Sequence, residues 1–131
     1  MTGNSLTDQH SHRELVAQFM NAWEAGDADG VMAVFGDDCT YAASVGPEPG
    51  TTWRGRDAVA RGVAQMLAFE AGGESRQGEL WFSEDRAFAQ WSYNATAPDG
   101  RVMDVKGIDI IHFADGRIAS IDAYRKTTID A

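Results

Sequence analysis

Four β-strand patterns follow one another in the second half of this 131-residue chain, and they constrain its fold more than any other feature. Two of the connecting turns contain Asp-Gly, at Asp99-Gly100 and at Asp115-Gly116. Each suits a three-residue loop built on a type I turn that glycine closes in the left-handed region. Strands joined by such short turns pair in antiparallel order. The expected strands are residues 75–82, 86–96, 101–113 and 117–127.

Three helix patterns precede these strands. Val16, Phe19 and Trp23 recur at three- and four-residue spacing, which is typical of one face of a helix that ends at Gly26. The second helix is expected to stop at Gly36, and a short strand at residues 39–43 follows it. Helices first and strands afterwards indicate an α+β fold. The expected helices are residues 8–25, 27–35 and 56–69.

The chain is expected to form one domain. With 44% hydrophobic residues and no break in composition, it can bury a single core. We expect residues 1–9 to be a flexible N-terminal arm and residues 10–131 the domain, with His10 and His12 belonging to the loose arm. Residues 45–50, with two prolines and two glycines, are expected to form a loop or lid beside the third helix.

Charge and composition exclude several classes of partner. A net charge of −9 with 11 basic residues argues against binding to nucleic acid or to anionic membranes. Cys39 has no second cysteine to pair with, and we expect it to be a packing residue. We find no membrane span, signal sequence, metal-ligand spacing or phosphate loop, so we expect a cytoplasmic protein without metal or cofactor.

Turn lengths set which side chains share a face of the predicted sheet. If Ala97 pairs with Arg101, Trp91 and Tyr93 lie on the same face as Asp109 and Ile111. If Phe113 pairs with Arg117, the same face also carries Ile121, Ala123 and Arg125, with Asp122 and Tyr124 opposite. A two-residue turn at Asp115-Gly116 would exchange these two sets and bring Asp122 beside Asp109.

Asp109 is the candidate for acid–base chemistry. It interrupts an apolar strand face that carries Val105, Ile111 and Phe113. Desolvation penalises the charged form of a carboxyl group, so its pKa should be raised and it could exchange a proton near neutral pH. The alternative is a structural role, in which Asp109 forms an ion pair with Arg125 or a hydrogen bond with a tyrosine.

Several motifs resemble those of bacterial ketosteroid isomerase. The resemblance rests on Ala25-Gly26-Asp27, Asp29-Gly30, Phe35, Asp37-Asp38, Thr40, Val45-Gly46-Pro47-Glu48-Pro49, Ile108-Asp109, Phe113 and Gly116-Arg117-Ile118. It spans most of the chain and implies the nuclear transport factor 2-like superfamily, on the branch of the ketosteroid isomerases and SnoaL-like polyketide cyclases. That fold is a cone-shaped, curved, mixed or antiparallel sheet wrapped around N-terminal helices and enclosing one apolar pocket.

The isomerase activity itself is not expected to carry over. The isomerase uses an aspartate base and an oxyanion hole made of a tyrosine and a protonated aspartate. By the resemblance, the base position falls on Ala43, the tyrosine on Phe19 and the protonated aspartate on Asp109. Neither Ala43 nor Phe19 can transfer a proton, so we do not expect true steroid isomerisation.

We therefore hypothesise a SnoaL-like protein that binds a small apolar carbonyl or polyketide-like molecule and isomerises or cyclises it through Asp109. Tyr41 would assist as a hydrogen-bond donor, and the alternative for it is an ordinary half-buried core tyrosine. Arg125 could neutralise Asp109, hold an acidic substrate group or lie exposed at a strand end. The predicted pocket walls, which could also be plain core, are Phe19, Trp23, Phe35, Ala43, Trp53, Met66, Trp91, Tyr93, Ile111 and Ile121.

Two alternatives from other classes remain. The absence of functional groups at Ala43 and Phe19 favours a module that binds a ligand without turnover, or a dimeric accessory domain whose cone is filled. The outer sheet face, with Gln90, Lys106 and His112 on it, is expected to form a homodimer surface.

Overall fold

The computed structural model describes residues 6–129, with side chains from Ser11 onward, and it confirms the predicted α+β class. The described residues form three helices and six strands, and their order along the chain is as predicted except for the short strand β2, which was not predicted. In chain order the elements are α1 (Leu6–Glu24), α2 (Ala28–Met32), β1 (Phe35–Ala42), β2 (Thr52–Arg54), α3 (Arg56–Glu70), β3 (Glu74–Ser83), β4 (Arg86–Thr96), β5 (Val102–Ala114) and β6 (Arg117–Arg125).

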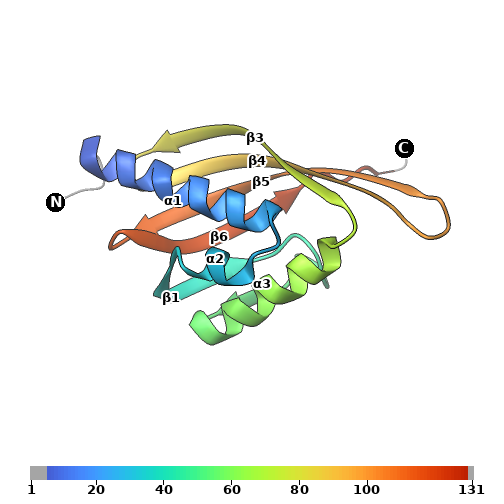
Figure 1. Cartoon of the computed structure of the whole chain (residues 1–131), viewed down its shortest axis with the longest axis horizontal. Helices are drawn as coiled ribbons and strands as arrows, with labels where there is room; N and C mark the ends of the chain where they lie inside the picture. Colours follow the sequence, from blue (N-terminus) through green and yellow to red (C-terminus); the bar gives the residue numbers. More distant parts are fainter. Residues whose placement is uncertain (1–5, 130–131) are drawn as a thin grey trace.

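The six strands form one open, mixed sheet with the order β2-β1-β6-β5-β4-β3. All neighbours are antiparallel except β1 and β6, which are parallel because the chain crosses from one edge of the sheet to the other between them. Figure 1 shows the three helices on one side of the curved sheet, and the β4–β5 hairpin extending beyond the body of the protein. None of the helices described here is long and apolar enough to cross a membrane.

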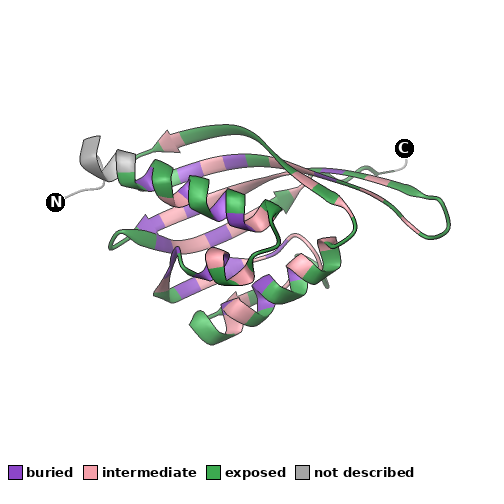
Figure 2. Ribbon diagram, in the orientation of Figure 1, coloured by how far each residue is buried: buried purple, intermediate pink, exposed green. Residues whose placement is uncertain are grey.

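The core lies between the helices and the inner face of the sheet. Figure 2 shows buried positions alternating along the strands and gathering on the helix surfaces that face them. Ile111, Ile118 and Ile121 are almost fully buried, and they pack with Val16, Val59 and Val63 from the helices. Cys39 is buried in the same cluster, as expected of a packing residue.

Helix α1 starts earlier than predicted. It begins at Leu6 and includes His10 and His12, so the assignment of both histidines to a loose arm is wrong. His12 is buried, and its ring stacks on Phe113 with the centroids 4.0 Å apart and the planes 4° apart. Residues 1–5 of the predicted arm lie outside the described residues.

The second helix is shorter than predicted. It ends at Met32, and Phe35, which was expected inside the helix, begins β1 and pairs with Ile118. Arg56 joins the two elements, because its guanidinium donates to the carbonyls of Met32 at 2.9 Å and Phe35 at 2.8 Å. These long-range bonds and the pairing with β6 decide the boundary, and neither can be recognised from local sequence.

The turn between β5 and β6 differs from the prediction, yet the predicted face is correct. Ala114 pairs with Arg117, so Asp115-Gly116 is a two-residue turn with positive φ angles of 53° and 72°, as in type I′. An irregularity follows, because Phe113 pairs with Ile118 and His112 with Ser120. The extra residue in β6 reverses the exchange of faces that a two-residue turn would otherwise cause. Asp109 therefore pairs with Ala123, and Gly107 with Arg125.

Candidate functional site

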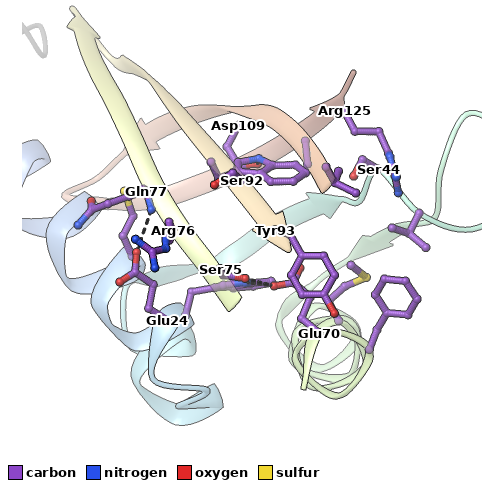
Figure 3. A pocket seen from close by; sticks show the side chains of 18 of the residues that line it. Glu24, Ser44, Glu70, Ser75, Arg76, Gln77, Ser92, Tyr93, Asp109 and Arg125 are labelled. Atoms are coloured by element: carbon purple, nitrogen blue, oxygen red, sulfur yellow. Dashed lines mark hydrogen bonds between the residues drawn. The ribbon is translucent and has the colours of Figure 1, made fainter. Parts of the chain in front are cut away.

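A cavity lies between the inner face of the sheet and helices α1 and α3 (Figure 3). Most of its wall is apolar, and polar side chains reach it from α1 and α3 as well as from β3, β5 and β6. The predicted site residues that line it are Phe19, Trp23, Tyr41, Met66, Trp91, Tyr93, Asp109 and Arg125. These eight side chains come from six elements, so the fold brings together residues that lie far apart in the sequence.

Asp109 is held in the cavity wall by Trp91. The indole Nε1 of Trp91 donates to Asp109 Oδ1 at 2.9 Å. Gly107, which pairs with Trp91 across the strands, makes this geometry possible, because a Cβ atom there would overlap the indole ring. The indole thus lies across β5 at Gly107, and its N–H reaches the next inward-facing residue of that strand.

The electrostatic environment favours the protonated form of Asp109. Burial, helped by the charges of Glu70 and Asp122 and opposed by the Trp91 hydrogen bond, raises the pKa of Asp109 to about 7. The alternative partners expected from the sequence, Arg125 and a tyrosine, are wrong. Within residues 6–129 Asp109 has neither an ion pair nor a tyrosine donor, and Trp91 takes that place.

Tyr41 lies at the centre of an aromatic cluster in the cavity wall. Its ring stacks on Trp53, with the centroids 5.6 Å apart, and the edge of Trp23 meets it at 6.1 Å. Burial, followed by the charges of Asp109 and Glu70, raises the pKa of the Tyr41 hydroxyl well above its usual range. The hydroxyl therefore stays protonated at neutral pH, when it can donate a hydrogen bond but cannot accept a proton as a phenolate.

Glu70, at the end of α3, belongs to the site although the sequence analysis did not select it. Its Oε1 accepts hydrogen bonds from Trp23 Nε1 at 3.0 Å and from Ser75 Oγ at 2.7 Å. These bonds join α1, α3 and β3 at one wall of the cavity. A glutamate next to the predicted helix end gives no local signal, because helix termini commonly carry exposed charges.

Strand β3 contributes a second set of polar residues that the sequence analysis missed. Arg76 and Gln77 line the cavity, and the backbone N–H of Gln77 donates to Glu24 Oε2 at 3.0 Å. The pairing of β3 with β4 shifts register between Gln77 and Leu80, and such an irregularity bends the strand locally. Because most residues of β3 are exposed, no alternation of buried and exposed side chains marks this irregularity in the sequence.

Five residues that were predicted as ligand-binding do not line this cavity. Phe35, Ile111 and Ile121 are buried in the core. Trp53 lies behind Tyr41 and packs flat over Gly62, where a Cβ atom would overlap its ring. Ala43, like Ile121, borders a separate hollow beside the loop at residues 44–50. These residues were predicted from the side of the strand on which they lie. Other side chains of the core separate them from the cavity, and the strand pattern does not reveal these.

Comparisons with known proteins agree with this architecture. The family model for the SnoaL-like domain matches residues 16–121. An NTF2-like protein of unknown function from Mesorhizobium loti is 24% identical, with a TM-score of 0.75, 90% of this chain covered and 93% of that chain. The epoxide hydrolase/cyclase-like enzyme SalBIII is 18% identical, with a TM-score of 0.75 and coverages of 93% and 95%.

TerC, co-crystallised with polyporic acid, is 16% identical, with a TM-score of 0.73, 88% of this chain covered and 92% of that chain. Identities this low show the shared fold alone. The search of curated proteins finds no match to the chain.

Proposed function

Because the chain belongs to the SnoaL-like domain family, we propose that it binds a small, largely apolar organic molecule in its cavity and that Asp109 exchanges a proton with that molecule. The observation that carries the proposal is the carboxyl group of Asp109 in the cavity wall, which has Trp91 Nε1 as its hydrogen-bond donor. Burial raises the pKa of Asp109 to about 7, so both protonation states are populated at neutral pH.

The chemistry that fits such a group is an internal proton transfer. The carboxylate removes a proton from one atom of the ligand, and the resulting acid returns it to another atom of the same ligand. An isomerisation or a ring closure of this kind consumes no co-reactant. A ligand with a carbonyl, quinone or epoxide oxygen would supply the atom that receives the proton.

Tyr41 would support this transfer as a neutral donor. Its hydroxyl lines the same cavity as Asp109, and the raised pKa keeps it protonated. A hydrogen bond from a buried hydroxyl stabilises negative charge as it develops on a ligand oxygen. Tyr41 is therefore proposed to hold that oxygen, with Asp109 on the other side of the reacting atoms.

Two structural relatives support a small-molecule role. SalBIII is described as an epoxide hydrolase/cyclase-like enzyme in pyran ring formation in the polyether salinomycin, and TerC was crystallised with polyporic acid. Both descriptions concern oxygen-rich organic compounds. The description of SalBIII supports ring closure of such a compound, and the specific substrate follows from neither description.

A second candidate is binding without turnover. Phe19 lines the cavity at the position where the isomerase resemblance implies an oxyanion tyrosine, and Ala43, at the implied base position, does not line it at all. These replacements leave Asp109 and Tyr41 as the groups that would carry catalysis. The experiment below distinguishes the two candidates.

The test uses 5-nitrobenzisoxazole, an apolar probe that a base converts to a coloured cyanophenolate. The base removes the ring C–H proton, and the electron pair breaks the N–O bond. We expect the wild-type rate to rise with pH around a midpoint near the pKa of Asp109, and Asp109→Asn to abolish it. Asp115→Asn, in the exposed turn between β5 and β6, removes the same charge and should leave the rate unchanged.

Two results would overturn proton transfer by Asp109. One is a rate that survives Asp109→Asn, and the other is a midpoint below about pH 5, near the usual aspartate range. If the probe binds, as measured by quenching of tryptophan fluorescence, but no elimination exceeds that of the buffer, binding without turnover becomes the function.

The proposal includes a homodimer through the outer sheet face. Trp81 pairs with Phe88 and Phe88 with Ile110, so these side chains form an apolar row on the face away from the helices. Trp81 remains 46% exposed. Arg86 and His112 pair at one end of this face, where Asp85 contacts both, and Asn94 and Asp104 pair at the other end. A second copy packed in the opposite direction would set these two polar ends against each other and the apolar rows at the centre.

Analytical ultracentrifugation tests the dimer. We expect a dimer for the wild type and a monomer for Ile110→Asp, because the substitution buries a charge at the centre of the interface. Val102→Asp, at an exposed position near the tip of the β4–β5 hairpin, is the matched control and should remain dimeric. A monomeric wild type would contradict the assignment.

A further inference from the structure

We infer that the natural ligand of the cavity is an organic acid with a planar apolar body, whose carboxylate binds Arg125 while its opposite end meets Asp109. The inference rests on the proposed use of this cavity for a small molecule. It adds the charge of the ligand, its length and the residue that selects it.

Most charged groups in the cavity wall already have a partner within the protein. Glu24 accepts a hydrogen bond from Gln77, and Glu70 accepts two, from Trp23 and Ser75. Arg76 forms an ion pair with Glu74, with 2.6 Å between Nη2 and Oε1. Arg125 is the charged residue of this wall for which the described part of the chain supplies no hydrogen bond or ion pair.

Arg125 and Asp109 lie near each other on the inner face of the sheet. Arg125 of β6 pairs with Gly107 of β5, and the next inward-facing pair of these two strands is Ala123 with Asp109. Arg125 and Asp109 are therefore diagonal neighbours on the inner face, with Cα atoms about 7–8 Å apart. Figure 3 shows Arg125 on the same side of the cavity as Ser44, away from Glu24 and Glu70.

A flat aromatic surface lies between the two charged groups. The indole of Trp91 covers Gly107, in the space between the inward positions of Arg125 and Asp109. Ala123, opposite Asp109, has a small side chain that leaves this surface open. A planar ring stacked on the indole would have one edge at Arg125 and the other at Asp109.

These dimensions select a class of ligand. A guanidinium binds a carboxylate through two parallel hydrogen bonds, and the geometry is specific as well as strong. One or two fused rings span the distance between Arg125 and Asp109. Since the protein carries a net charge of −9, an anion gains no general attraction from the surface, and a cation inside the cavity is required to hold it.

The experiment compares 2-naphthoic acid with 2-naphthamide by isothermal titration calorimetry at pH 8, where the acid is fully ionised. The two probes have nearly the same shape and differ in charge. We expect the wild type to bind the acid at least about tenfold more tightly, which corresponds to one or two charge-assisted hydrogen bonds. Arg125→Met, which keeps an unbranched apolar stem, should reduce the ratio of the two affinities to about one.

Two further variants keep the test decisive. Lys126→Met removes the same charge from an exposed neighbouring position and should retain the preference for the acid. Arg125→Lys keeps the charge without the planar fork and should retain part of the preference, so it controls for loss of folding in Arg125→Met. Equal binding of acid and amide by the wild type, binding of neither, or a preference that survives Arg125→Met would overturn the inference.

The outcome is separable from that of the proposed proton transfer. If the wild type eliminates 5-nitrobenzisoxazole but shows no preference for the acid, the role of Asp109 stands and the anion site is wrong. If elimination fails but Arg125→Met abolishes a clear preference for the acid, the anion site stands and the proton transfer is wrong.

Discussion

Trp91 lies flat across Gly107 of the neighbouring strand, and this contact directs its indole N–H to Asp109, two residues further along that strand. A glycine in the middle of a sheet costs stability, because it has no side chain to pack and loses more backbone entropy than other residues. Here the missing Cβ atom is the condition for the hydrogen bond. Gly107 therefore determines the environment of Asp109 without touching it.

Gly107→Ala should displace the indole and break its hydrogen bond to Asp109. That bond lowers the pKa of Asp109, so its loss should raise the pKa above about 7. The expected rise is about one unit, since a hydrogen bond to a charged group contributes about 1.5–3 kcal/mol. Carboxyl-carbon NMR titration measures it directly.

Gly36→Ala, where a Cβ atom would meet its nearest neighbour at 3.5 Å, is the control and should leave the titration unchanged. Trp91→Phe removes the N–H and keeps a ring, and it should produce the same rise as Gly107→Ala. A pKa that stays the same or falls in both variants would contradict this account.

Asp109→Asn should increase stability at alkaline pH. The pKa of Asp109 in the folded protein is about 7, above its unfolded value of about 3.9, so the native state binds the proton more tightly. The free energy of unfolding therefore falls as pH rises from about 4 to about 7. In total the free energy of unfolding falls by on the order of 4 kcal/mol, and the neutral side chain of asparagine avoids this loss.

Urea unfolding at pH 4.5 and pH 8 tests this prediction. The gain in stability of Asp109→Asn over wild type should be small at about pH 4.5 and reach roughly 2–4 kcal/mol at about pH 8. Asp115→Asn, in the exposed turn between β5 and β6, should show no such growth. A gain of equal size at both pH values would mean that the effect is not the titration of Asp109.

His12→Phe should stabilise the protein. The imidazole stacks on Phe113, yet its Nδ1 is buried and has no hydrogen-bond partner. A phenyl ring keeps the stacking and removes the unsatisfied atom, which costs about 1–3 kcal/mol. We expect the free energy of unfolding to rise by about 1 kcal/mol in denaturant titrations. His12→Ala, which also loses the stacking, should lower it, and a less stable Phe variant would contradict this interpretation.

Arg56→Met should destabilise the protein by about 2–3 kcal/mol. The two hydrogen bonds from Arg56 to the carbonyls of Met32 and Phe35 are lost, and these partly buried acceptors gain no other donor. Arg61→Met, at an exposed position of the same helix, should change stability by less than about 0.5 kcal/mol. Thermal or urea unfolding compares the two, and equal effects would exclude a specific role for Arg56.

The inner face of the sheet shows how far the sequence could be interpreted. The pairing of Trp91 with Gly107 and of Ala89 with Asp109 is as predicted, because the loop at Ala97–Arg101 fixes one register for the whole hairpin. The face of β6 was correct although its turn was not. Ile118 and Ile121 are both buried and lie three residues apart, which in a strand requires a bulge, and this was the signal that could have revealed it.

Local periodicity and the desolvation of a single group were enough to predict part of this protein from its sequence. That part is the α+β class, the four strands β3 to β6 with their inward faces, the resemblance to the SnoaL-like family, and Asp109 as a carboxyl group on an apolar face.

The hydrogen-bond partners of the site residues follow only from the folded structure. Trp91 rather than Arg125 or a tyrosine binds Asp109, Glu70 joins the site from the end of α3, and Arg125 is left without a partner among the described residues. These relationships depend on a glycine that admits an indole, on a bulge in β6 and on a bend in β3. Each is a steric fit between segments far apart in the chain, and such a fit is specified only when the whole core is packed.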